Sequence, residues 1–115
     1  MTAPTIDRPT FEALRDLTGA EFAQELIDTF LQEAPSMLDA LRHALAAGDA
    51  DKFRRAAHSL KSNSNTFGAL ALGAMARELE VAGVARAAAG ATPSLDALAQ
   101  EYARVATALS ALRHA

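Results

Sequence analysis

Residues 21–47 constrain the fold most, because apolar side chains recur there at helical spacing over the whole segment. Phe22, Leu26, Phe30, Met37, Leu41 and Ala44 form one stripe, and Ile27, Leu31 and Leu38 form a second stripe beside it. A face this wide predicts one long amphipathic helix that touches more than one neighbour. Pro35 lies inside the segment and is expected to kink the helix or break it locally.

Four other segments share this period and predict helices over residues 10–17, 50–66, about 69–89 and 93–113. In the first of them, Phe11, Leu14 and Leu17 share one side. Gly48 and Asp49 supply a stop and a new cap, and Thr92 is expected to cap the last helix with Pro93 in its first turn. No segment alternates at period two. The fold class is therefore all-α, an antiparallel four-helix bundle with a short additional N-terminal helix, in one domain over 1–115 whose residues 1–9 form a flexible lead-in.

Composition narrows the function. The formal net charge is −3 and no basic stripe is present, which argues against nucleic acid as a partner. The chain has no cysteine, so disulfides and thiolate metal sites are excluded. No apolar run approaches the roughly 20 residues that span a bilayer, and residues 1–9 do not resemble a secretion signal. We therefore expect a cytoplasmic protein that binds neither membrane nor metal.

His58 faces water in the predicted helix over 50–66. At about 100° per residue, the apolar and small side chains Phe53, Ala56, Ala57, Leu60, Ser64 and Phe67 fall within an arc of roughly 100°. His58 points about 150° away from the middle of that arc. An exposed histidine is most often only a solvated side chain, so its neighbours decide whether it has a function.

Those neighbours suit a phosphoryl acceptor. Neutral imidazole is a nucleophile near pH 7, and Lys61, three residues on, can bring a positive charge to a group bound on the ring. Residues 62–65 are small and polar, which lowers helix propensity but leaves room for a partner. The sequence has no glycine-rich phosphate loop and no acidic set for Mg²⁺, so the chain has no evident means of using ATP.

Residues 58–69, read as His-Ser-Leu-Lys-Ser-Asn-Ser-Asn-Thr-Phe-Gly-Ala, resemble the signature of histidine-containing phosphotransfer (HPt) domains. In that family His-x-Leu-Lys-Gly is followed by small residues and then Gly-Ala. The likeness extends over about residues 21–109. It implies an HPt bundle that accepts a phosphoryl group from a receiver-domain aspartate and passes it to another receiver in a two-component phosphorelay.

The resemblance also implies roles for single residues. His58 is the phospho-acceptor through Nε2, Lys61 assists by its charge, and Glu80 matches a position where Gln or Glu often holds the other ring nitrogen. Without that contact, Glu80 is a solvated glutamate. Ser62 departs from the family glycine, lines the site, and either narrows access or donates a hydrogen bond to the phosphoryl group.

Docking is expected on a patch near the histidine, with candidates Leu14, Ile27, Leu31, Ser59 and Asn65. Alternatively, the three apolar residues only pack the short helix onto the bundle. The implied partners are receiver domains of response regulators and of a hybrid histidine kinase. No cofactor is expected on this chain, and a Mg ion is expected on the partner receiver. The chain is expected to be a free-standing monomer, with His43 and His114 as surface residues.

Two other functions remain open at this stage. A helical adaptor or inhibitor could use the apolar face while His58 is incidental. A phosphatase acting on a receiver could use Asn63 and Asn65 to orient water. Such a hydrolase would be expected to insert an acidic and an amide group together, and no acidic residue lies between Asp51 and Glu78. The phosphocarrier is therefore the preferred hypothesis.

Overall fold

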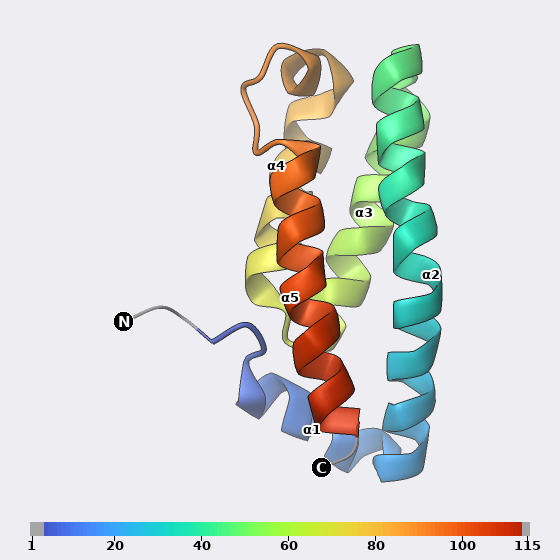
Figure 1. Cartoon of the computed structure of the whole chain (residues 1–115), viewed down its shortest axis with the longest axis vertical. Helices are drawn as coiled ribbons and strands as arrows, with labels where there is room; N and C mark the ends of the chain where they lie inside the picture. Colours follow the sequence, from blue (N-terminus) through green and yellow to red (C-terminus); the bar gives the residue numbers. More distant parts are fainter. Residues whose placement is uncertain (1–3, 114–115) are drawn as a thin grey trace.

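A computed structural model describes residues 4–113 of the chain. Within them it contains helices and no strand. The helices are α1 (Arg8–Thr18), α2 (Ala20–Ala47), α3 (Ala50–Thr66), α4 (Leu70–Ala88) and α5 (Leu95–Arg113). The four long helices form the bundle, and α1 lies at its lower end (Figure 1). The predicted fold class is confirmed. In the described part of the chain, no helix combines the length and apolar character needed to cross a membrane.

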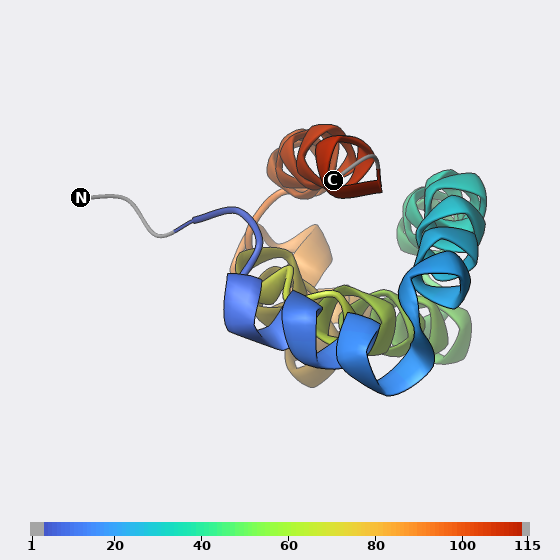
Figure 2. The ribbon, with the colours of Figure 1, turned by 90° about the horizontal axis from the view of Figure 1, so that it is seen from below.

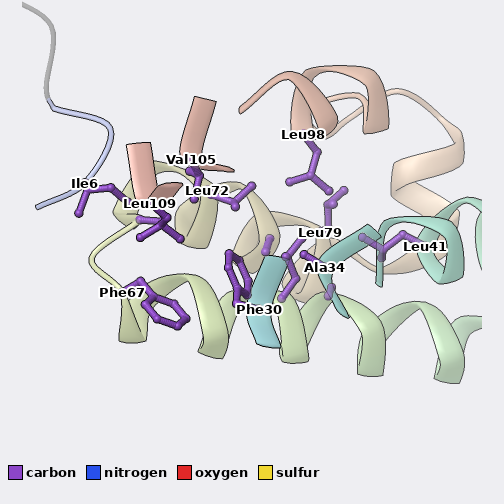
Figure 3. Packing of buried hydrophobic residues seen from close by; sticks show 14 of the residues in the cluster. Ile6, Phe30, Ala34, Leu41, Phe67, Leu72, Leu79, Leu98, Val105 and Leu109 are labelled. Carbon is purple, nitrogen blue, oxygen red and sulfur yellow. The ribbon is translucent and has the colours of Figure 1, made fainter. Parts of the chain in front are cut away.

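The core lies between the four long helices and is built from leucine, phenylalanine and alanine. Phe30 and Phe67 anchor its lower half, with ring centroids 5.2 Å apart, and Leu72, Val105 and Leu109 pack near them (Figure 3). Ala34, Ala57 and Ala76 are fully buried. Small side chains at these positions allow helices to approach closely, as the alanine-rich composition requires.

The lead-in before α1 belongs to the fold from Ile6 onward. Ile6 is only 4% exposed and packs in the core, and the Asp7 backbone N–H donates to the Gly68 carbonyl at 2.8 Å. The Asp7 carboxylate caps α1 by accepting from the Thr10 backbone N–H. The expectation of a flexible segment is therefore wrong for these residues, and α1 begins at Arg8. At the start of that segment, residues 1–3 lie outside the described chain.

The inward faces of α1 and early α2 also differ from the prediction. Leu17 is 86% exposed and Phe22 is 50% exposed, whereas Ala23 and Ile27 are buried. Seen from below, α1 runs across the lower end of the bundle (Figure 2). Phe11 of α1 and Leu112 of α5 line one small cavity together with Ala23 and Ile27 of α2. These neighbours therefore determine which stripe of α2 faces inward.

Pro35 does not break α2, which runs as one helix through it. Proline has no backbone N–H, so the Leu31 carbonyl loses its usual partner four residues on. The Tyr102 hydroxyl of α5 donates to this carbonyl over a long distance of 3.4 Å. Burial raises the pKa of Tyr102 and keeps the hydroxyl protonated as a donor. Tyr102 thus packs against α2 and also replaces the hydrogen bond that the Leu31 carbonyl loses because of Pro35.

Two features of α4 and α5 depart from the predicted helices. Gly83 has φ +82° and ψ 172°, so α4 is two helical stretches joined at a bend rather than one continuous helix. The last helix begins at Leu95, and its cap is Ser94, whose Oγ accepts from the Ala97 backbone N–H at 3.0 Å. Thr92 is not the cap, because its hydroxyl contacts the Pro93 carbonyl instead.

Replacing Gly68 by alanine should destabilise the fold strongly. Gly68 has φ +84°, and an added Cβ would lie 2.7 Å from the Asp7 carbonyl oxygen. Backbone strain and this clash should together lower the free energy of unfolding by about 3 kcal/mol. Gly48→Ala is the matched control, because Gly48 has φ +67° with no atom near its Cβ position, and should cost about 1 kcal/mol. Equal losses for the two variants in urea unfolding would contradict the contact with Asp7.

Candidate functional site

His58 lies in the middle of α3 with 59% of its side chain exposed. Asp49 caps this helix by accepting from the Lys52 backbone N–H at 3.1 Å, and Asp51 adds a favourable negative charge in the first turn. The buried face of α3 carries Phe53, Ala57, Leu60 and Ser64. The helical periodicity therefore predicted the position of His58 correctly, on the face of α3 away from the core.

Glu80 of α4 joins His58 and Lys61 into one chain of contacts. One carboxylate oxygen lies 2.5 Å from His58 Nδ1, and the other accepts from Lys61 Nζ at 2.7 Å. The Glu80 side chain is 18% exposed and the Lys61 side chain 24%. Glu80 is thus not a solvated glutamate. It lies in a partly closed position between two functional candidates.

The charge on Glu80 determines which nitrogen of the His58 ring carries the proton. The hydrogen bond from Lys61 lowers the pKa of Glu80 below its ordinary 4.5, burial opposes this shift, and the contact with His58 reinforces it. Glu80 is therefore ionised at neutral pH and can only accept hydrogen bonds. In the neutral ring of His58, the proton therefore lies on Nδ1, and the Nε2 lone pair is available.

The pH dependence of this contact follows from the sign of the shift. Because the folded pKa lies below the unfolded one, the contact stabilises the fold fully above about pH 4.5 and is lost as pH falls through the folded pKa. A ¹³C NMR titration should therefore give a Glu80 midpoint below 4.5. Removing the ammonium in Lys61→Met should raise that midpoint. An unchanged midpoint in the variant would mean that Lys61 does not set the pKa.

The polar residues after His58 are largely engaged with their own helix. The Asn63 side-chain amide donates to the Ser59 carbonyl at 2.8 Å, and the Thr66 hydroxyl donates to the Ser62 carbonyl at 2.9 Å. These bonds compensate for the low helix propensity of the run. They also tie the Asn63 amide nitrogen to the backbone, which weakens the phosphatase hypothesis. Ser62 itself is exposed, one helical turn from His58.

The predicted docking residues fall into two groups. Leu14 and Leu31 are half-buried, and Ser59 and Asn65 are exposed, so each can be reached from outside. Ile27 is 0% exposed, and its predicted direct contact with a partner is therefore wrong. It supports the surface from beneath, where α1 and the end of α5 cover it.

The sequence did not predict several features of the site and its surroundings. The exposed apolar residues Leu17 and Phe22 were counted as inward, because a helix wheel cannot tell which stripe a neighbour will cover. The contact between Lys61 and Glu80 was missed because the two residues lie on different helices and are 19 positions apart in the sequence. Among the other histidines, His43 is exposed as predicted, and His114 lies outside the described residues.

The fold and the exposed histidine define a helical-bundle phosphocarrier, and comparison with known proteins identifies its family. The Hpt domain model matches residues 25–115, so the chain belongs to the Hpt domain family. It is similar to the crystal structure of histidine-containing phosphotransfer protein B (HptB) from Pseudomonas aeruginosa PAO1. The TM-score is 0.84 and the sequence identity 29%, over 98% of this chain and 97% of that one. No curated protein gives a significant sequence match.

Membership gives the general function. Proteins of this family carry phosphoryl groups and are not kinases, and they interact with receiver domains in two-component relays. This chain is thus a histidine phosphotransfer protein of a phosphorelay. The adaptor and phosphatase hypotheses are set aside in favour of the carrier.

Proposed function

We propose that His58 is the residue that receives a phosphoryl group from a receiver-domain aspartate and passes it to another receiver. One observation carries this assignment. The exposed ring of His58 is held at Nδ1 by Glu80, whose second oxygen holds the nearby ammonium of Lys61. The arrangement leaves Nε2 free as the nucleophile and keeps a cation within one helical turn of it.

The transfer step follows from this geometry. The Nε2 lone pair attacks phosphorus, a P–N bond forms, and the bond from phosphorus to the aspartate oxygen breaks, releasing the partner's carboxylate. The ring gains positive charge as the bond forms, and the Glu80 carboxylate at Nδ1 stabilises it. Lys61 Nζ, held at Glu80 in the resting protein, can turn toward the phosphoryl oxygens. Transfer outward reverses these steps.

The chain acts in this proposal as a carrier without an ATP site of its own. The partner receiver would supply Mg²⁺, whose charge would offset that of the phosphoryl oxygens. The receivers are those of response regulators and of a hybrid histidine kinase, and the chain meets them as a monomer in the cytoplasm. Sedimentation of the purified chain and fractionation of cells test the last two points.

Docking is proposed on the surface around the lower half of α3. Leu14 and Leu31 provide apolar contacts, and Ser59, Asn65 and Ser62 provide small polar ones close to the ring. The exposed side chains of Leu17 and Phe22 extend this surface at the junction of α1 and α2. Apolar anchors surrounded by small polar groups are typical of transient protein contacts.

The test is direct transfer. The protein is incubated with receivers phosphorylated on aspartate, and acid-labile, alkali-stable phosphate is sought on it. Peptide mapping should place that phosphate on residue 58. Receiver phosphate that disappears without any appearing on this chain would instead indicate a phosphatase, and phosphate on another residue would refute the assignment.

Lys61→Ala should slow the transfer about tenfold with an intact fold. The variant removes the cation that would meet the phosphoryl oxygens, while the partly exposed Lys61 side chain is not part of the apolar core. Rapid-quench rates with a phosphorylated receiver measure the effect, and far-UV circular dichroism measures the helix content. A large fall in helicity would show that Lys61 is structural.

A further inference from the structure

A groove of about 860 Å³ runs along the surface between α2 and α3, on the half of each helix that lies away from α1. Its floor is made of Met37, Ala40, Ala44 and Ala56. Alanine side chains on facing helices leave this space because they are too short to fill it. One end of the groove reaches Ser59, the residue next to His58. The groove therefore leads along the bundle to the proposed phospho-acceptor.

The two walls of the groove carry opposite charge. Glu33 and Asp39 line the α2 side together with His43. Lys52 and Arg55 line the α3 side, where Asp49, the N-cap of α3, is the one acidic lining residue. Among residues 4–113, no ion pair joins one wall to the other. Arg55 is paired with Asp51 on its own helix at 2.6 Å, while Lys52 Nζ forms no ion pair with the described residues. The acidic residues of α2 thus flank the apolar floor without pairing with the basic residues of α3, and the Lys52 ammonium is the cation of that wall that no described residue neutralises.

This pattern suits a helix better than an extended segment. An extended peptide here would find no sheet edge to satisfy its backbone N–H and C=O groups, whereas a helix satisfies them internally. Small side chains on the floor allow a helix of the usual diameter, about 10 Å, to approach closely. Its apolar face would cover Met37 and the alanines, and its edges would meet the charged walls.

We propose that the α2–α3 groove binds an amphipathic helix of the receiver-bearing partner. That helix carries acidic residues along the edge that faces Lys52 and Arg55, and basic residues along the edge that faces Glu33 and Asp39. The proposal rests on the proposed phosphotransfer function and adds a determinant of partner choice. Because the groove ends at Ser59, a helix bound there lies beside the transfer site.

Charge reversals separate this proposal from simple electrostatic attraction. The probe is the full-length phosphorylated receiver protein that transfers fastest in the assay above. If the partner helix has two oppositely charged edges, Lys52→Glu and Glu33→Lys should each lower kcat/KM for transfer about fivefold. Both losses should shrink at high salt. Long-range attraction to a partner of one sign would instead make the two variants change the rate in opposite directions. That result would overturn the proposal.

A steric variant tests occupancy without changing charge. Ala40 is exposed on the groove, so Ala40→Trp should fill it and lower kcat/KM about tenfold. Matched controls on other surfaces are Ala111→Trp on α5, and Arg86→Glu and Glu78→Lys on α4, all at exposed positions. These should transfer at the parent rate. A parent rate for Ala40→Trp as well would show that the groove is empty during transfer.

Phosphoramidate, a small-molecule phosphodonor, distinguishes the hypothesis that His58 is the phospho-acceptor from the hypothesis that the groove binds the partner. Every groove variant should be labelled on His58 by phosphoramidate as fast as the parent, because this donor needs no docking. Failure of labelling in the parent chain would refute the role of His58, not the groove. Normal phosphoramidate labelling with unaffected receiver transfer in all groove variants would refute the groove alone.

Discussion

His58→Gln is expected to abolish phosphoryl transfer from a receiver to this chain. The amide of glutamine has no lone pair able to form a P–N bond, so the carrier loses its only covalent step. The rate should fall by more than about a thousandfold, to the background of the assay. The His58 side chain is 59% exposed, so the same substitution should leave the fold intact, with a melting temperature within about 2 °C of the parent.

The other two histidines provide matched controls for this result. His43 is exposed on α2, outside the Glu80 contact, and His43→Gln should still be phosphorylated on His58; because His43 also lines the α2–α3 groove, its rate with a receiver reports on that surface as well. His114→Gln completes the set, since the chain has three histidines. Transfer that persists in His58→Gln and disappears in either control would overturn the assignment. Radiolabelled transfer from one receiver, with acid and alkali stability of the product, distinguishes all three.

Sequence reasoning predicted His58 well because its orientation depends on one helix only. The buried residues of α3, Phe53, Ala57 and Leu60, follow the helical period strictly, so the opposite face is exposed wherever the helix lies. The inward side of α2 near its start depends on other helices as well. There α1 and α5 converge on Ala23 and Ile27, and Phe22 is turned toward solvent.

Pro35 and Gly83 show the same limit at the level of the backbone. The rule that proline breaks a helix considers only the helix itself. It cannot anticipate Tyr102, which lies 71 residues from Leu31 in the sequence and donates a hydrogen bond to the Leu31 carbonyl. Gly83 was counted as one more helical residue, although its φ of +82° bends α4 three residues after Glu80. Single-segment rules cannot include a compensating group or a bend that only the packed bundle defines.

The contact between Glu80 and His58 was expected from family resemblance, not from periodicity. The two residues are 22 positions apart on different helices, and no spacing rule joins them. The resemblance gave no indication that the same carboxylate also holds Lys61. As a result, Glu80 connects two roles that the sequence treated as independent, and substitutions at this position can separate them.

Glu80→Ala is expected to lower the rate of transfer about 10- to 100-fold, the usual effect of losing a group that orients a reactive imidazole. Without the carboxylate, His58 Nδ1 and Nε2 compete for the proton, the ring rotates freely, and the charge that develops during attack loses its partner. Lys61 also loses its anchor. Circular dichroism should show a parent-like helix content, because Glu80 is not part of the apolar core.

Glu80→Gln separates the two contacts and is the decisive comparison. The amide oxygen can still accept from His58 Nδ1–H, but the remaining amide nitrogen is a donor and cannot accept from the Lys61 ammonium. If orientation of the ring is the main role, Glu80→Gln should remain within about threefold of the parent rate while Glu80→Ala falls far below it. Equal losses in the two variants would show that the carboxylate charge matters more than its hydrogen bond to the ring. Parent rates in both would show that Glu80 has no part in the transfer.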